Sequence, residues 1–236
     1  MNALIFKDFK ESKFLPFSHP KAKHIRGVLK LKSGDEIFAG VANQNLYKTK
    51  IFETAQGYEF DPQTTPLENP PQLEITLCVA FTRPQIAKRI MFEAACFGVK
   101  NLVFYAAQKG ERDYLKASLY NSDEAQESLI KGAEQACSSF IPNLLLAESL
   151  QNALKQTQEA EIKIAPDLYE STQNISQIQA KDKPIAAVFG GERGFSNADR
   201  EVLRDCGFTL VSLGRRVLRT DSAIIAALAI LANATQ

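Results

Sequence analysis

The chain has 236 residues, of which 45% are hydrophobic and 15 are Phe, which is enough apolar material for a packed core and excludes a disordered chain. The formal net charge is only +1, so the chain is not basic overall, although residues 12–34 contain six Lys and Arg and no acid. We find no apolar run of membrane-spanning length and no N-terminal signal pattern. The four cysteines are far apart, which favours reduced core thiols, no bound metal and a cytoplasmic protein.

The first part of the chain is predicted to be rich in short strands. Residues 4–6, 35–41, 46–54 and 58–60 have strand character, with turn residues between them and a short helix expected at 23–31. Several short strands within about 60 residues indicate a small β-barrel. Residues 61–71 contain four prolines, which hold the chain extended and mark a linker.

From residue 73 onward the pattern changes to strands that alternate with helices. The expected strands are 73–81, 101–106, 144–146, 162–165, 185–189 and 208–213. The expected helices begin near residues 84, 123, 150, 197 and 220. This alternation predicts a parallel sheet with crossover connections.

Two glycine-rich loops follow the last two strands. The first is Gly190-Gly191-Glu192-Arg193-Gly194-Phe195-Ser196, and the second is Gly214-Arg215-Arg216-Val217-Leu218-Arg219-Thr220-Asp221. Ser196 with Asp199 predicts a capping box, and Thr220 is expected to cap the final helix. In an open α/β sheet such loops lie at the carboxyl ends of neighbouring strands, where ligands bind. Glycines alone could serve only the tight turns, but two loops that also carry arginines favour a ligand site.

Both loops resemble the paired signature of the RsmE family, SPOUT-class methyltransferases that modify N3 of a uridine in small-subunit ribosomal RNA. The second loop, from Leu213 to Ala223, is similar to the family pattern L-G-x-R-I-L-R-T-E-T-A. The first is similar to I-G-P-E-G-G-F-S, with Gly191 in place of Pro and Arg193 in place of Gly. Weaker similarities lie at Glu134-Gln135 with Pro142, and from His24 to Asp35.

The resemblance implies a SPOUT-type knotted parallel sheet, with a deep C-terminal trefoil knot, behind a small PUA-like β-barrel. Residues 1–68 would be the RNA-binding barrel and residues 73–236 the methyltransferase domain. It also implies S-adenosylmethionine as cofactor, 16S ribosomal RNA as substrate, a homodimer, and neither a metal nor a membrane. A non-catalytic RNA-binding relative is the alternative. A nucleotide-binding oxidoreductase is a third hypothesis, but no Gly-x-Gly-x-x-Gly follows an early strand.

The resemblance also assigns candidate residues. Arg219 would stabilise the negative charge of a deprotonated uridine, and Glu192 or Asp221 would accept the proton unless each only pairs with an arginine. The implied cofactor-binding residues are Phe189, Gly190, Gly191, Glu192, Gly194, Leu213, Gly214, Val217, Leu218 and Thr220. The expected RNA-binding residues are Lys21, Lys23, Arg26, Lys30 and Lys32. The alternative is that these charges only form a solvent-exposed face of the domain.

Overall fold

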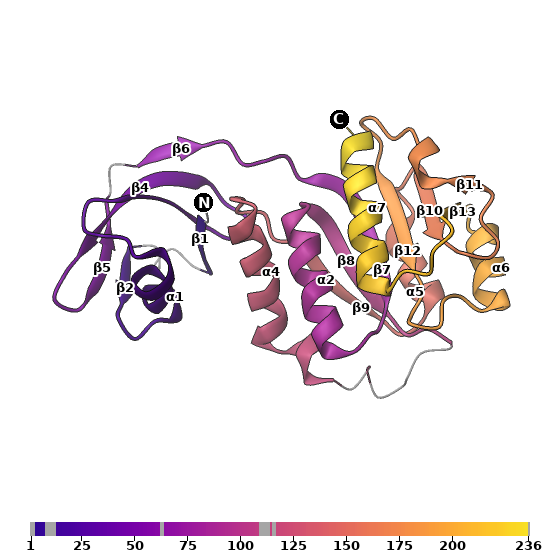
Figure 1. Cartoon of the computed structure of the whole chain (residues 1–236), viewed down its shortest axis with the longest axis horizontal. Coiled ribbons are helices and arrows are strands. Elements are labelled where there is room, and N and C mark those ends of the chain that lie inside the picture. Colours follow the sequence, from indigo (N-terminus) through magenta and orange to yellow (C-terminus); the bar gives the residue numbers. More distant parts are fainter. Residues whose placement is uncertain (1–2, 8–12, 62–63, 109–113, 115–116, 236) are drawn as a thin grey trace. The chain divides into compact units, whose positions relative to one another are not determined.

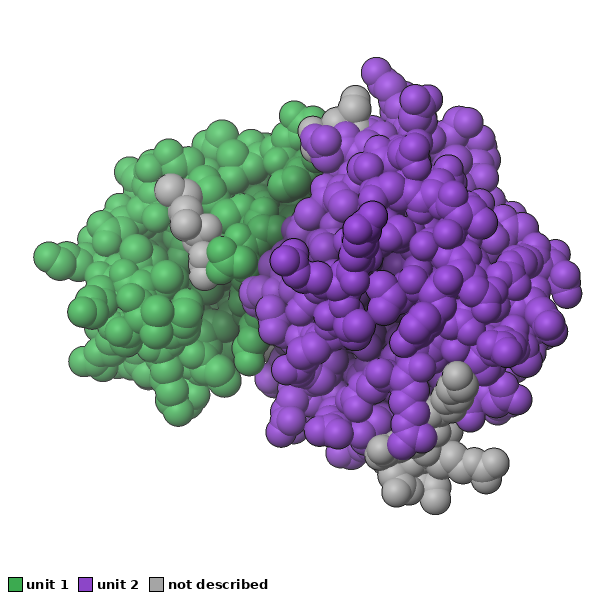
Figure 2. Space-filling model, turned by 45° about the vertical axis from the view of Figure 1, so that its right-hand side comes forward, with its two compact units in different colours: residues 1–71, 130–141 green, residues 72–129, 142–236 purple. Residues whose placement is uncertain are grey.

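The computed structural model describes residues 3–7, 13–61, 64–108, 114 and 117–235. The chain divides into two compact units (Figure 2). The N-terminal unit comprises residues 1–71 and 130–141, and the C-terminal unit comprises residues 72–129 and 142–236. The sequence did not predict that residues 130–141 group with the N-terminal unit.

In its described residues the N-terminal unit has six short strands, one short helical segment and residues 130–135 of helix α4, Asp123–Gln135. Its strands pair in the order β1-β3-β4-β5-β2, with β6 also on β4; β1 and β3 are parallel and the other pairs are antiparallel. The strands are β1 Ala3–Phe6, β2 Phe14–Pro16, β3 Glu36–Val41, β4 Leu46–Glu53, β5 Gly57–Phe60 and β6 Thr65–Leu67. Helix α1, Pro20–His24, continues into a π-helical turn, Ile25–Leu29.

Two of these strands were not predicted. β2 has three residues, too few for a recognisable alternation. β6 lies inside the proline-rich linker and contains Pro66. A proline that lacks an N–H is tolerated on an edge strand, and among the described residues β6 pairs with β4 only.

Glu134 is a structural anchor of the N-terminal unit. Its Oε1 accepts a hydrogen bond of 3.0 Å from the backbone N–H of Ile5 in β1. The same oxygen forms an ion pair with Lys21 of α1. This carboxylate therefore ties a strand and a helix together, next to a core made by Leu4, Phe6, Leu15, Ala22, Ile25, Ile37, Ala39, Ile51 and Tyr58.

The C-terminal unit contains a seven-stranded sheet in the order β11-β13-β10-β12-β7-β8-β9 (Figure 1). Every neighbouring pair is parallel, which confirms the predicted parallel α/β fold. The strands are β7 Leu73–Ala80, β8 Val99–Tyr105, β9 Asn143–Ala147, β10 Ile162–Pro166, β11 Gln173–Asn174, β12 Ile185–Phe189 and β13 Thr209–Ser212. The helices that begin in this unit are α2 Pro84–Cys96, α4 Asp123–Gln135, α5 Leu150–Leu154, α6 Asn197–Asp205 and α7 Thr220–Ala234, with 3₁₀ turns at Ser118–Asn121, Lys155–Thr157 and Ile175–Gln177. Residues 130–135 of α4 belong to the N-terminal unit.

Strand β12 occupies the middle of this sheet. All five of its residues are buried, as expected for a strand of a parallel sheet that is covered on both faces. β12 and β13 are not neighbours, because β10 lies between them. The prediction that the two glycine-rich loops follow adjacent strands is therefore wrong. The carboxyl end of β10 lies between the ends of the two strands that these loops follow.

The helix boundaries near the two loops are well defined. Ser196 and Asp199 form the predicted capping box at the start of α6. Arg219, and not Thr220, is the N-cap of α7, so the prediction that Thr220 caps this helix is wrong.

Cys78 is buried, but Cys206 is exposed, which corrects the expectation of a core thiol there. Within the described ranges, no helix combines the length and apolarity needed to cross a membrane.

Candidate active site

A cavity of about 720 Å³ lies in the C-terminal unit at the carboxyl ends of β12, β10 and β13. This volume falls within the range of small-molecule sites. Arg219 and all ten residues predicted to bind the cofactor line it. The structure thus brings the two loops together around one cavity. Further lining residues come from the end of β10 and the segment after it, Pro166, Asp167, Leu168 and Tyr169, and from the start of α2, Arg83, Gln85 and Ile86.

The first loop, residues 190–196, is a tight turn. The backbone N–H of Gly194 donates a 2.9 Å hydrogen bond to the carbonyl of Gly191, and Gly194 has φ +65°. Just before the loop, the hydroxyl of Tyr105 donates a 3.0 Å hydrogen bond to the carbonyl of Phe189. Burial raises the pKa of Tyr105 well above its ordinary value, so this hydroxyl stays protonated and keeps the end of β12 in place.

Two adjacent glycines of this loop provide a matched test. A Cβ on Gly190 would lie 2.9 Å from the carbonyl carbon of Gly194, whereas a Cβ on Gly191 would meet only the Cβ of Ala80 at 3.6 Å. We expect Gly190→Ala to lower the free energy of unfolding by about 1–3 kcal/mol, and Gly191→Ala to change it by less than about 0.5 kcal/mol. Urea unfolding of both variants measures this. Equal losses would contradict the close backbone approach at Gly190.

The second loop is more open over residues 214–219, before α7 begins. Gly214 has φ +107°, and its N–H donates a 3.0 Å hydrogen bond to Ser212 Oγ. Val217 is 81% exposed although it lines the cavity. The side chain of Arg219 is 73% exposed, so its guanidinium is available to a ligand.

Asp221 lies beneath Arg219, in the first turn of α7. It is only 2% exposed. Its Oδ2 accepts a 3.0 Å hydrogen bond from Arg89 of α2, and its Oδ1 lies 3.5 Å from Arg219 Nε without hydrogen-bond geometry. Oδ1 has no hydrogen-bond partner among the described residues. Two guanidinium groups and the N-terminus of α7 lie close to this carboxylate, and one of its oxygens is left for a donor.

Glu192, the other candidate proton acceptor, is also close to an arginine. Its Oε1 lies 3.3 Å from Arg83 Nε, and Arg83 Nε donates to the hydroxyl of Tyr114 at 3.1 Å. Both side chains of the ion pair are about half exposed. The structure therefore pairs both candidate carboxylates, Glu192 and Asp221, with arginines.

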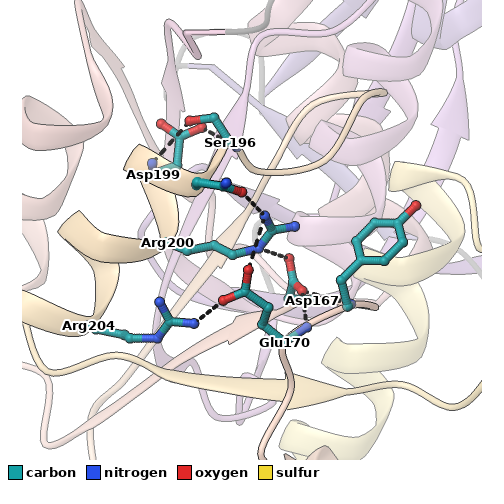
Figure 3. Close-up of polar contacts among 8 residues, drawn as sticks. Asp167, Glu170, Ser196, Asp199, Arg200 and Arg204 are labelled. Carbon is teal, nitrogen blue, oxygen red and sulfur yellow. Dashed lines mark hydrogen bonds and ion pairs between the residues drawn. The ribbon is translucent and has the colours of Figure 1, made fainter.

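A buried ion pair supports the wall after β10 (Figure 3). Arg200 Nε of α6 donates a 2.9 Å hydrogen bond to Asp167 Oδ2, and both side chains are at most 7% exposed. Asp167 Oδ1 accepts the N–H groups of Tyr169 and Glu170 at 2.8 and 2.7 Å. Sequence reasoning missed this cluster. Its only signal was an aspartate directly after an apolar strand.

The comparisons with known proteins agree with this geometry. Residues 68–232 match the RNA methyltransferase domain family. A ribosomal RNA small subunit methyltransferase E 1 from Borreliella burgdorferi is 27% identical over 99% of this chain and 98% of its own length. The chain belongs to the RsmE family of RNA methyltransferases. A second RsmE relative, from Treponema pallidum, is 27% identical over 93% of this chain and 85% of its own length.

An RsmE crystal structure has the same fold. It is a ribosomal RNA small subunit methyltransferase E from Neisseria gonorrhoeae bound to S-adenosyl methionine. It is 18% identical, covers 100% of this chain and 98% of its own, and gives a TM-score of 0.77. In the present chain, the two loops that carry the RsmE signature both line the 720 Å³ cavity.

The basic residues predicted to bind RNA lie in the N-terminal unit. Lys23, Arg26, Lys30 and Lys32 are exposed. Lys21 is paired with Glu134, and its side chain is only 20% exposed. Four of the five side chains are therefore exposed to solvent, and their RNA-binding role stays a prediction.

In the part of the chain that the structure describes, no cluster of three His, Cys, Asp or Glu could hold a metal ion.

Proposed function

We propose that this RsmE-family protein transfers a methyl group from S-adenosylmethionine to N3 of a uridine in 16S ribosomal RNA. The observation that carries the proposal is the convergence of the two RsmE signature loops on one cavity, which an exposed guanidinium, Arg219, and a buried carboxylate, Asp221, both line. A cavity at the carboxyl ends of parallel strands, where charged side chains converge beside apolar ones, is typical of an active site.

The residues of the cavity suit a sulfonium nucleotide. Asp221 Oδ1 is a buried acceptor without a hydrogen-bond partner among the described residues, and the methyl donor offers an ammonium group, ribose hydroxyls and an adenine amine. Gly191 and Gly214 allow close approach of a ligand to their backbone groups, whereas the space beside Gly190 is taken by the backbone of Gly194. When bound, the donor supplies an electrophilic methyl group on sulfur, so that no metal is required for its activation.

The protein has to stabilise the uridine as a nucleophile. N3 would have to lose its proton to attack the methyl group, and the negative charge of the deprotonated ring would spread over its two carbonyl oxygens. Arg219 would donate hydrogen bonds to these oxygens. Glu192 would accept the proton directly or through a water molecule, while Arg83 holds its carboxylate in place at 3.3 Å. The target base must leave its stack to reach the cavity.

The chain path supports a knotted fold. α7 follows β13, which is second from the edge of the sheet, and yet contacts α2 and the 3₁₀ turn Ile175–Gln177. The segment after β13 must therefore pass the long connection between β10 and β12, residues 167–184. We propose that it passes through this connection and forms the trefoil knot that the RsmE resemblance implies, which is a rare exception to the usual topology rules.

We also propose a homodimer and an RNA-binding role for the N-terminal unit. α7 is almost entirely apolar, and Ile225 and Ile230 on it are only partly buried, so a second copy would cover them in a cytoplasmic homodimer. Light scattering would then give twice the 26.1 kDa of one chain. The exposed Lys23, Arg26, Lys30 and Lys32, on a PUA-like barrel of residues 1–68, would contact RNA phosphates and position the substrate.

Reverse transcription of 16S ribosomal RNA tests the proposed reaction. An N3-methyl group blocks Watson–Crick pairing, so we expect a stop in RNA from wild-type cells that is absent after deletion of the gene. The purified protein with S-adenosylmethionine should restore the stop on RNA from the deletion strain. Calorimetry measures binding of the methyl donor separately.

The possible outcomes separate the alternatives. Donor binding without any change in reverse transcription would reject N3 of a uridine as the target and keep an RNA methyltransferase. No donor binding and no methylation, together with retained RNA binding, would support the non-catalytic relative instead.

A further inference from the structure

Tyr169 is an exposed aromatic residue at the edge of the candidate active site. It follows β10, lines the cavity and is 79% exposed. A large aromatic side chain normally gains most of its stabilisation from burial. Because most of its ring surface stays in water, Tyr169 contributes little to the stability of the core. Packing therefore does not explain a tyrosine at this position.

The backbone at Tyr169 is nevertheless held firmly. Asp167 Oδ1 accepts its N–H at 2.8 Å, and the buried ion pair with Arg200 holds Asp167 in turn. The guanidinium carbon of Arg200 lies 5.7 Å from the centre of the tyrosine ring, within the range of a cation–π contact. The turn and the arginine together place the ring at the cavity while leaving it open to solvent.

A fixed, exposed ring beside a cavity suits stacking on a nucleobase. Proteins that bind single-stranded RNA stack its unpaired bases on aromatic side chains. A preorganised tyrosine loses little rotamer freedom on binding. Exposed Arg216 and Val217 line the same cavity, so a base entering from solvent would meet a cation and an apolar side chain as well.

We propose that Tyr169 is a positioning residue that stacks on an unpaired RNA base, either the target uridine or the nucleotide next to it. The assignment rests on the proposed function. The RNA is favoured over the methyl donor because Tyr169 is 79% exposed, whereas Gly190 and Gly214 are partly buried and Asp221 is only 2% exposed. Stacking here would hold the unstacked strand while N3 enters the cavity.

The chain contains no tryptophan, which allows a direct test of stacking. Tyr169→Trp introduces the only tryptophan of the chain at the proposed contact, and tryptophan can be excited selectively beside the remaining tyrosines. We expect unmodified 16S ribosomal RNA transcript to shorten its fluorescence lifetime, and S-adenosylmethionine alone to leave the lifetime unchanged. A change with the methyl donor alone, or none when RNA binding is established by anisotropy, would overturn the proposal.

Steady-state kinetics provide the second readout. Tyr169→Ala should raise the KM for RNA by about 10-fold to 100-fold, with a smaller effect on kcat and an unchanged dissociation constant for the methyl donor. Tyr169→Phe keeps the ring and should restore a KM close to that of the wild type. A purely structural role would instead lower thermal stability in Tyr169→Ala and affect the binding of RNA and methyl donor alike.

The two proposals fail in different ways. If the wild-type protein methylates no RNA but the lifetime of Tyr169→Trp still responds to RNA, the contact stands and the proposed reaction is rejected. If the wild-type protein methylates 16S ribosomal RNA and Tyr169→Ala does so with an unchanged KM, the reaction stands and the stacking role is rejected.

Discussion

Arg219→Ala is expected to lower kcat for ribosomal RNA methylation by about 100-fold to 1000-fold, the loss typical of one preorganised donor to a developing anion. The side chain of Arg219 is 73% exposed, so its removal should leave the fold intact. Asp221 keeps its 3.0 Å hydrogen bond from Arg89 in this variant. Single-turnover methylation with saturating methyl donor measures the chemical step.

Two further variants define what Arg219 contributes. Arg219→Lys keeps the positive charge but loses the planar fork of donors, so we expect it to recover only part of the rate. Arg215→Ala is the matched control, because Arg215 is an exposed arginine of the same loop that does not line the cavity. If Arg219→Ala and Arg215→Ala reduced kcat equally, a general electrostatic effect would replace the specific role of Arg219.

Asp167→Ala is expected to destabilise the C-terminal unit by about 3–5 kcal/mol, because it leaves the Arg200 guanidinium buried without its main partner. The variant also removes the acceptor for the N–H groups of Tyr169 and Glu170. Asp167→Asn would keep an oxygen for those two groups, but an NH2 donor would replace the oxygen that accepts from Arg200. It loses the charge and the Arg200 hydrogen bond but not the turn contacts, so it should be destabilised less than Asp167→Ala. Denaturant unfolding monitored by circular dichroism measures both variants.

Glu170→Ala is the control for this ion pair. Glu170 lies 3.6 Å from the same arginine, Arg200, but its side chain is 40% exposed, and a surface ion pair contributes at most about 1 kcal/mol. A loss in Glu170→Ala as large as in Asp167→Ala would show that burial does not determine the cost.

Local sequence patterns were sufficient for most elements of the C-terminal unit. The five apolar residues of β12 predicted a buried strand, and Ser196 with Asp199 predicted the start of α6. These signals depend on residues close in the chain. A strand buried on both faces is a continuous apolar run, and a capping box has its two polar residues three positions apart. The short β2 and the proline-containing β6 lacked such a spacing, because pairing with a distant strand decides whether they form.

The residues of the candidate site were predicted only as far as they lie in the two signature loops. Arg89, Asp167, Tyr169 and Arg200 carry no motif, and each acquires its role through a partner distant in sequence. Arg89 is 132 positions from Asp221, and Arg200 is 33 positions from Asp167. A single sequence does not contain the information that such pairs meet.

The amino-acid sequence by itself determined that this chain forms a parallel α/β sheet with two glycine- and arginine-rich loops of RsmE type near its C-terminus. Only the tertiary structure decided that β10 lies between β12 and β13, and that residues 130–141 group with the N-terminal unit. The physical reason is that strand order and burial depend on which apolar surfaces, distant in the sequence, pack against each other and exclude water. For the same reason, the acceptor left on Asp221 and the exposed ring of Tyr169 could be recognised only after folding.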